Sequence, residues 1–348
     1  MRGKRKKEII PFLLFNIYEL RIDENGILYV ITSTYIFKVG TNNIVTRYGG
    51  NGSYLYTGDG GLATSASFYA VETVFDALGN LYFSDTENHV IRKIDTNGII
   101  TTIAGDGSSG YTGDGGLATS AKINKPRGLI FDSNGALYFS DSGNHVIRKI
   151  NEDGIISTFA GTGIAGFSGD NGQASNAEIN TPEDIIIDES GNIIFFGVGH
   201  GQFGRIRKID TSGIITTIAG TDEIYNGDNI LATEARINLP RNMAMDKNDN
   251  LYIAEQRTNR IRKIDSNGII TTVAGTGEGG FSGDGGAATS AGIDAPRGVA
   301  VDDNGNIYIS DKSNNRIRKV DTDGIITTDA GNGESGYSGD GDVATSAK

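Results

Sequence analysis

A short loop built on glycine and aspartate occurs six times along this chain at nearly even spacing. Successive copies are separated by 55, 56, 58, 56 and 56 residues, and their aspartates are Asp59, Asp114, Asp170, Asp228, Asp284 and Asp340. A period of this length is typical of repeat architectures, in which each unit is too small to bury its own apolar faces and must pack against its neighbours. The chain is therefore predicted to form a ring or a stack of similar units.

Each unit between two such loops is predicted to form four short strands. In the clearest copy these strands are followed by Gly, Asn or Asp turns and cover residues 128–132, 136–141, 145–150 and 155–160. The six units are expected at residues 17–49, 71–105, 127–161, 183–220, 241–275 and 297–331, with the Gly-Asp loops as connectors. An open solenoid is one way to bury six small sheets, but propellers commonly have about four to eight such blades. We predict an all-β, six-bladed β-propeller of four-stranded antiparallel blades over residues 17–348, closed without a strand borrowed from the other terminus.

The two ends of the chain lie outside the regular units. Residues 1–16 form a leader in which basic residues precede an apolar run at 9–15, as in the start of a secretory signal, but no small-residue cleavage site follows. The run is also too short to span a bilayer as a helix, so no transmembrane segment is expected. We expect the leader to pack against the first unit, with a targeting segment as the alternative, and the tail 336–348 to pack near residues 8–16.

Composition excludes several classes of function. The 348 residues carry a net charge of −12, which argues against a nucleic-acid partner because phosphate binding needs a basic surface. The chain has no cysteine, which excludes disulfides, thiolate metal sites and thiol nucleophiles. An acidic, cysteine-free, loop-rich chain suits an extracellular location or a particle surface.

One pattern within the units is specific. The second unit reads LYFSD at 81–85, NHVIRKI at 88–94 and GIITTIAG at 98–105, and its connector reads YTGDGGLATSA at 111–121. This pattern resembles the NHL repeat in its bacterial form, and the resemblance extends over nearly the whole chain from residue 17. The resemblance implies a six-bladed β-propeller. It does not decide the function, since the family includes protein-binding scaffolds, sensor domains, RNA-binding domains and a few lyases.

The recurring charged residues are predicted to be structural. Only Asp340 has a second carboxylate, Asp342, near calcium-ligand spacing, so each loop aspartate is expected to accept backbone N–H groups and fix the turn between blades. The Ser-Asp pairs that end second strands are assigned to turn chemistry rather than catalysis. The Arg-Lys pairs of the third strands (92–93, 148–149, 207–208, 262–263 and 318–319) are expected to be exposed partners of loop carboxylates, each worth less than about 1 kcal/mol. A basic ring for RNA is the alternative.

Histidines occur at three positions of two kinds. His89 and His145 fill the position that Asn259 and Asn315 occupy in later units, which indicates a loop role. His200 instead lies in the Gly-rich loop 197–204, about three residues longer than its counterparts. It is the best local candidate for a specific function, with a structural role as the alternative.

The channel mouth is the most promising place for a site. The first position of each innermost strand is expected to line it, on the face of the connectors: Tyr18, Val71, Arg127, Glu183, Arg241 and Arg297. Three arginines opposite Glu183 and Asp184 suit an anionic group, although they could simply neutralise neighbouring carboxylates. The weak metal candidates are Glu183, Asp184 and Asn242, beside repelling arginines, so we predict no metal and no cofactor.

These features favour a non-catalytic binding or scaffold propeller that recognises a protein or glycan partner through its connector face. Near-identical units without a catalytic constellation are its basis. The alternatives are a metal-dependent lyase or lactonase-type enzyme with a channel-mouth site, and an RNA-binding propeller.

Overall fold

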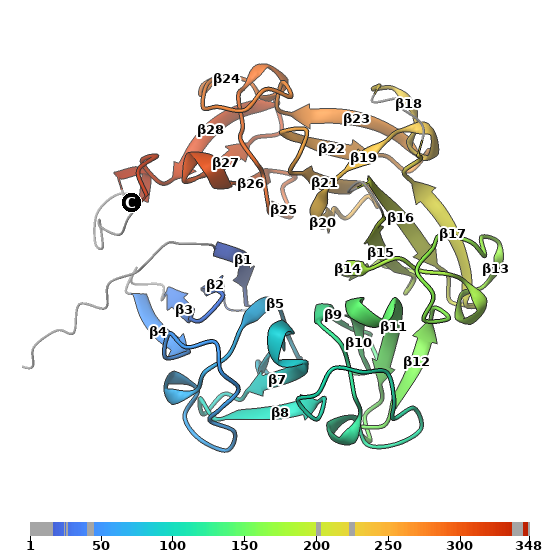
Figure 1. Ribbon diagram of the computed structural model, residues 1–348. Helices are drawn as coiled ribbons and strands as arrows, with labels where there is room; N and C mark the ends of the chain where they lie inside the picture. The colour runs from blue at the N-terminus through green and yellow to red at the C-terminus, as the bar shows by residue number, and fades with distance from the viewer. Residues whose placement is uncertain are drawn as a thin grey trace, which may run out of the picture.

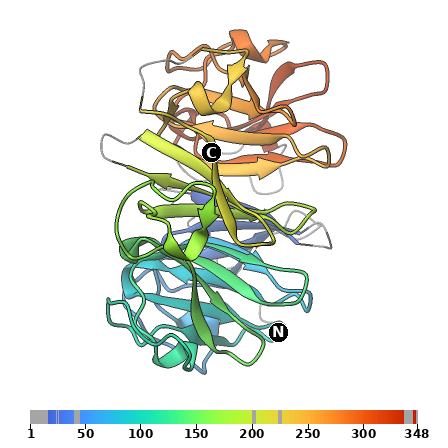
Figure 2. The ribbon, with the colours of Figure 1, turned by 90° about the vertical axis from the view of Figure 1, so that its right-hand side faces the viewer.

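Six antiparallel sheets are arranged around a central channel in the computed structural model (Figure 1). The structure describes residues 17–23, 25, 27–39, 45–199, 203–222, 227–335 and 344–346. Each sheet contains four strands that are consecutive in the chain, and the first of the four is the innermost strand. The predicted six-bladed β-propeller of four-stranded blades is thereby confirmed. Figure 2 shows the same blades from the side of the ring.

Blades 1 to 3 have these strands in chain order. Blade 1 comprises β1 (Ile17–Ile22), β2 (Leu28–Thr32), β3 (Ile36–Val39) and β4 (Val45–Gly49). Blade 2 comprises β5 (Ala70–Phe75), β6 (Leu81–Asp85), β7 (Val90–Ile94) and β8 (Ile100–Ala104). Blade 3 comprises β9 (Pro126–Phe131), β10 (Leu137–Asp141), β11 (Val146–Ile150) and β12 (Ile156–Ala160).

Blades 4 to 6 follow the same plan. Blade 4 comprises β14 (Pro182–Ile187), β15 (Ile193–Val198), β16 (Phe203–Ile209) and β17 (Ile214–Ala219). Blade 5 comprises β20 (Pro240–Met245), β21 (Leu251–Glu255), β22 (Arg260–Ile264) and β23 (Ile269–Ala274). Blade 6 comprises β25 (Val299–Val301), β26 (Ile307–Asp311), β27 (Arg316–Val320) and β28 (Ile325–Ala330).

The connectors add short elements that the sequence did not predict. β13 (Gly172–Gln173), β18 (Ile230–Leu231) and β24 (Gly286–Ala287) each pair with the outermost strand of the blade that follows, and β19 (Ile237–Asn238) pairs with β16. Three-residue 3₁₀ turns occur in the connectors and after second strands: η1 (Ala63–Ser65), η2 (Thr86–Asn88), η3 (Ala118–Ser120), η4 (Ser142–Asn144), η5 (Ala174–Asn176), η7 (Ala232–Glu234), η8 (Ala288–Ser290), η9 (Lys312–Asn314) and η10 (Ala344–Ser346). Each connector therefore wraps over the outer edge of the next blade before it enters that blade's innermost strand.

The turns between strands follow from their sequence. In blade 3, Asp132 Oδ1 accepts the backbone N–H groups of Asn134 and Ala136, each at 2.9 Å. Gly135 has a φ of 81°, a left-handed conformation that glycine adopts without strain. An aspartate followed by such a glycine therefore reverses the chain in a fixed geometry and sets the register of the two strands.

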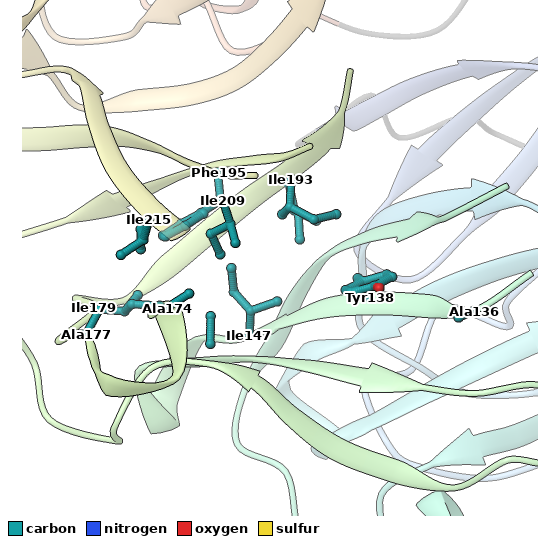
Figure 3. Close-up of a cluster of buried hydrophobic side chains, with 12 residues drawn as sticks. Ala136, Tyr138, Ile147, Ala174, Ala177, Ile179, Ile193, Phe195, Ile209 and Ile215 are labelled. Carbon is teal, nitrogen blue, oxygen red and sulfur yellow. The ribbon is translucent and has the colours of Figure 1, made fainter. Parts of the chain in front are cut away.

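The core is divided among the junctions between blades. Five clusters of buried apolar side chains occur among the described residues, one at each junction between consecutive blades. At the junction of blades 3 and 4, Ile147 meets Ile179 of the connector and Phe195 of the next blade (Figure 3). Each blade therefore completes the core of its neighbour.

The junction between blade 6 and blade 1 differs from the other five. None of the five clusters of described residues joins these two blades. A cavity of about 300 Å³ extends there from the inner strands, lined by Glu19 and Arg21 of β1 and by Tyr308 and Ile317 of blade 6. The predicted contact between the tail and residues 8–16 lies outside the described residues.

Candidate functional site

The predicted channel mouth brings three charged side chains together. Arg127 Nη1 lies 3.2 Å from Glu183 Oε2, and Arg241 Nη1 lies 3.8 Å from the same oxygen. Arg241 Nε also donates a hydrogen bond of 2.6 Å to Gln256 Oε1. Two arginines, from the blades on either side of blade 4, thus share its carboxylate, which is the arrangement expected if they neutralise Glu183.

The other residues predicted at the channel mouth differ in their burial and in how much of each the structure describes. Val71 is buried in β5, and the backbone of Tyr18 lies in β1, although its side chain is outside the described part. The backbone N–H of Arg297 donates to Ser310 O at 3.1 Å just before β25, and the residue has further interactions of its own. His200 lies outside the described residues, so its candidacy stays a prediction.

A second ring of polar residues lies one position further along the innermost strands. Glu19 Oε2 accepts both the backbone N–H and the hydroxyl of Thr73 in the next blade, each at 2.7 Å. Asp184 Oδ2 accepts the backbone N–H of Met243 at 2.8 Å. One blade later, Asn242 Oδ1 accepts the backbone N–H of Val299 at 2.9 Å. These side chains therefore join three pairs of neighbouring innermost strands: β1 with β5, β14 with β20, and β20 with β25.

Only some residues of this inner ring were predicted from the sequence. Asp184 and Asn242 were considered as mouth or metal residues, whereas Glu19 and Glu72 at the equivalent position were missed. The available signal was that one register position carries a carboxylate or an amide in four of the six units. The pairing with the backbone of the next blade required the structure.

The inner ring concentrates acidic groups in a poorly solvated place. Burial raises the pKa of Asp184 to about 6. Burial also raises the pKa of Glu72 well above its ordinary value, and the nearby carboxylates of Asp184 and Glu19 raise it further. Within the described stretches, no group of three or more His, Cys, Asp or Glu side chains is arranged to hold a metal ion.

A buried arginine in blades 2 to 6 secures the connector that precedes its blade. In blade 3, Arg148 donates from Nη1 to Lys122 O at 3.3 Å and from Nη2 to Thr112 O at 3.2 Å and to Asp114 Oδ1. The equivalent pairs with Gly-Asp carboxylates measure 2.6, 2.6, 2.9 and 2.6 Å: Arg92–Asp59, Arg207–Asp170, Arg262–Asp228 and Arg318–Asp284. We call this arrangement the arginine clamp. Asp340, the sixth loop aspartate, lies outside the described residues.

The arginine clamp corrects one prediction from the sequence. The arginines of the Arg-Lys pairs were expected to be exposed, but all five are buried, while a lysine such as Lys149 remains 33% exposed. The reason is that the connector folds back over the third strand and surrounds the guanidinium with carbonyl and carboxylate acceptors, which offset its desolvation. The loop aspartates accordingly accept a guanidinium, and Asp59 also accepts the backbone N–H of Thr102 at 3.2 Å.

The aspartates that end second strands lie beside the arginine clamp. Asp141 Oδ1 accepts the backbone N–H of Asn124 at 2.7 Å, and its Oδ2 lies 3.7 Å from Arg148 Nη1. Burial raises the pKa of Asp141 to about 7 and that of Asp85, its counterpart in blade 2, to about 6. These carboxyls hold the start of the innermost strand rather than facing solvent.

His89 and His145 have the loop geometry that the sequence indicated. Their Nδ1 atoms accept the backbone N–H groups of Lys125 at 3.2 Å and Thr181 at 3.1 Å. At the equivalent position, Asn259 Oδ1 accepts the N–H of Ala295 at 2.8 Å. Burial lowers the pKa of both histidines, which favours the neutral ring that this acceptor role needs.

Exposed apolar side chains gather on the connectors, a feature that the sequence analysis missed. Of the ten large apolar residues that the described structure exposes, nine lie on connectors: Tyr54, Leu55, Tyr56, Leu62, Tyr111, Leu117, Ile164, Leu231 and Phe281. The tenth, Leu78, lies in the turn between β5 and β6. Of the helical segments described, none has the length and apolarity needed to cross a membrane.

The fold and the repeated arginine clamps define a β-propeller built from one sequence repeat. The model of the teneurin NHL domain matches residues 106–166, 221–282 and 276–338, which together exceed half of the chain. The chain therefore belongs to this family of NHL-repeat propellers.

Similar sequences occur in much longer proteins. Teneurin-m of Drosophila melanogaster is 31% identical over 278 residues, which cover 70% of this chain and 10% of that protein. Teneurin-1 of Gallus gallus is 29% identical over 289 residues, which cover 73% of this chain and 10% of that protein. Protein SUPPRESSOR OF QUENCHING 1 of Arabidopsis thaliana is 28% identical over 260 residues, which cover 69% of this chain and 24% of that protein. The chain spans about a tenth of the length of the teneurins that it matches.

Solved structures share the fold at low sequence identity. An auxiliary nutrient binding protein from Bacteroides ovatus superposes with a TM-score of 0.62 and 14% identity, over 90% of this chain and 69% of that one. Virginiamycin B lyase from Staphylococcus aureus superposes with a TM-score of 0.56 and 17% sequence identity, over 90% of this chain and 83% of that one. At such identity the likeness concerns the fold alone.

Proposed function

We propose that this propeller is a non-catalytic binding or scaffold module that recognises a protein or glycan partner through its connector face. The observation that carries the proposal is the concentration of exposed large apolar residues on the connectors. Exposed apolar side chains that gather on one part of a surface often mark an interaction site, whereas scattered single residues need no explanation. An extracellular or particle-surface location belongs to the same proposal.

The charged channel mouth supports binding over catalysis. A lyase or lactonase-type site there would need free carboxylates or metal ligands, whereas Glu183 is shared by Arg127 and Arg241. Asp184 is engaged with the backbone of the next blade. RNA binding is disfavoured by the burial of the clamp arginines, whose guanidinium groups are not available to phosphates.

The proposal is tested with a variant that removes apolar side chains from three connectors. The triple variant Leu117→Ser/Ile164→Ser/Leu231→Ser alters exposed positions and leaves the arginine clamps intact, while Leu78→Ser is the matched control at an exposed position outside the connectors. Both are compared with the unaltered chain for binding to a glycan array and for proteins cross-linked in the native source. We expect the triple variant to lose the bound partner and Leu78→Ser to retain it.

Two results would count against the proposal. Equal capture by the triple variant and the unaltered chain would show that the connector face is not the binding surface. A stoichiometric bound metal, together with turnover of a cyclic ester that Glu183→Gln abolishes, would replace the binding module with the enzyme alternative.

A further inference from the structure

We infer that Tyr54 and Leu55 of the first connector form the hot spot of the connector face, and that its partner is a protein presenting an apolar side chain flanked by Lys or Arg. The inference rests on the proposed function and names both the position and the partner class. It starts from two adjacent large apolar residues, a pair that no other connector has at these positions.

The first connector carries two large apolar residues where four of the other five carry small ones, while the fourth has Glu223 and Ile224. Tyr54 and Leu55 occupy the positions of Ser-Gly at 109–110, Ala-Gly at 165–166 and Gly-Gly at 279–280. Structural repetition does not require bulk there, because three other connectors form the same loop with small residues. The side chains are 59% and 67% exposed, so their bulk is presented to solvent rather than to the core.

The connector holds these side chains in a preformed arrangement. Asn88 Nδ2 donates to Tyr54 O at 3.1 Å, and the Tyr54 ring lies 5.7 Å from that of Tyr69 at an interplanar angle of 34°. The next residue, Tyr56, donates to or accepts from Thr102 Oγ1 at 2.8 Å, and its ring lies 5.2 Å from the guanidinium of Arg92. Because the loop is already ordered, a partner that binds here would lose less conformational entropy.

The chemistry of the patch favours a protein over a glycan. Leu55 offers no hydrogen bond to a sugar hydroxyl, and the hydroxyl of Tyr56 is already engaged by Thr102 and Asp59. An exposed tyrosine beside an aliphatic side chain resembles the central anchors of protein interfaces, where aromatic residues dominate the binding energy. The patch therefore suits an apolar side chain of a partner protein.

The surroundings of the patch indicate the charge of that partner. Asp106 is exposed and lies next to Gly107, whose position adjoins the Tyr56 ring. Glu87 directly precedes Asn88, whose side chain binds the backbone of Tyr54. The carboxylate of Glu87 forms an ion pair with Lys125. Because Lys125 balances the charge of Glu87, the attraction comes from Asp106 and from the chain net charge of −12, which favour a partner carrying Lys or Arg around its apolar anchor.

The experiment uses a random peptide library displayed on phage and panned against the full chain. The test variant is Tyr54→Ser/Leu55→Gly, which restores the small residues that another connector of this chain already has. Leu55→Ser serves as a milder second variant, and Leu78→Ser, at an exposed position outside the connectors, is the matched control. Thermal melting of each variant establishes that it is folded.

Enriched peptides should contain an aromatic or aliphatic residue flanked by Lys or Arg. Their affinity should fall at least about tenfold for Tyr54→Ser/Leu55→Gly and stay within about twofold for the control variant. It should also weaken as the salt concentration rises, because the rim contribution is electrostatic.

Other outcomes overturn the inference in different ways. Peptides that bind all variants equally, or a library that yields no enriched peptide, would remove the patch as a protein site. If the unaltered chain binds a glycan and Tyr54→Ser/Leu55→Gly does not, the partner is a glycan and not a protein of the proposed kind. If the unaltered chain self-associates and this variant does not, the partner is a second copy of this chain. If partner capture is lost in Leu117→Ser/Ile164→Ser/Leu231→Ser but not in Tyr54→Ser/Leu55→Gly, the proposed function stands and this inference fails.

Discussion

The five junctions between consecutive blades contrast with the junction between the last blade and the first. Each of the five contains a cluster of buried apolar side chains and an arginine clamp on the connector. Among the described residues no such cluster joins blades 6 and 1, and a cavity of about 300 Å³ reaches from the inner strands of blades 5 and 6 to Glu19 and Arg21 of β1. Equivalent residues show the difference, since Ile147 at a closed junction is fully buried while Ile317 of blade 6 is partly exposed.

One residue of blade 1 accounts for part of this contrast, because a phenylalanine stands where the other blades have the clamp arginine. Its third strand carries Phe37 at the register position that holds Arg92 in blade 2 and Arg148 in blade 3. Phe37 is buried and its ring lies 5.5 Å from that of Tyr35, so blade 1 fills the space of the arginine clamp with aromatic packing. A guanidinium binds the carbonyls of a connector, whereas a phenyl ring cannot. The comparison indicates that the arginine clamp joins each connector to the following blade.

The largest expected effect is the loss of one arginine clamp. Arg148→Ala should lower the free energy of unfolding by roughly 3–5 kcal/mol, because it leaves buried Asp141 without its cationic neighbour and two connector carbonyls without donors. Chemical denaturation measures the change. Lys149→Ala, one residue away, should cost less than about 1 kcal/mol. Equal losses in the two variants would contradict the buried role of the arginine.

A glycine pair tests how closely adjacent innermost strands approach at a closed junction. In Gly128→Ala the new Cβ would lie 2.5 Å from Glu183 O, so β9 and β14 must separate, at a cost of roughly 1–3 kcal/mol. The same change at the equivalent Gly298, which faces the junction of blades 6 and 1, meets among the described residues only Ser310 Cβ at 3.4 Å and should be tolerated. Similar melting temperatures for the two variants would remove this distinction.

Acidification should stabilise the closed junctions over a defined range of pH. Burial raises the pKa of Asp141 from 3.8 to about 7, so the folded chain keeps this proton at pH values at which the unfolded chain has lost it. The stabilisation is complete below about pH 4 and is lost as the pH rises through about 7, with a slope of about 1 kcal/mol per pH unit. Thermal melting between about pH 8 and pH 5 measures it.

Asp141→Asn separates this carboxyl from the other titrating groups. The variant carries no proton at this position to gain or lose, so its melting temperature should change less with pH than that of the unaltered chain. Asp302→Asn is the comparison, because the pKa of Asp302 is lowered and its contribution is lost only below about pH 4. A pH profile that Asp141→Asn leaves unchanged would rule out this carboxyl as the origin.

The smallest effect is expected where the chain itself already contains the substitution. His89→Asn should change the free energy of unfolding by less than about 0.5 kcal/mol, since Asn259 makes the same bond to the following connector in blade 5. His89→Ala removes the acceptor and should cost about 1 kcal/mol. Thermal melting of both variants measures the difference, and a large loss in His89→Asn would indicate a role for the imidazole beyond that bond.

The fold could be predicted from the sequence because the period and the turn residues are local signals. An aspartate followed by a left-handed glycine fixes each turn, as at Asp132 and Gly135, and the spacing of the loops gives the number of blades. The equivalence of His89 with Asn259 was readable for the same reason. The fifth strands that connectors add were not predictable, because Gly172–Gln173 becomes a strand only by pairing with β17 of the next blade.

The candidate site was less predictable because its contacts join different repeats. The sequence suggested that Arg127, Glu183 and Arg241 share the channel mouth, and the structure brings them together. It did not show that Glu19 binds Thr73, since the two are separated by 54 residues. Nor did it show that Tyr54 and Leu55 point outward, because burial depends on what the folded connector covers.

The sequence by itself determined the repeat, its strands and turns, and thus a propeller of six blades. Those features depend on backbone conformation and on apolar alternation within short stretches, which each residue carries regardless of its distant neighbours. Only the tertiary structure decided which charges are buried, because the desolvation of Arg148 depends on a connector that folds over it from 26 to 36 residues away in the chain. It also decided which apolar side chains of neighbouring blades pack together at the five junctions with a described cluster, since packing is a property of two surfaces and not of one repeat.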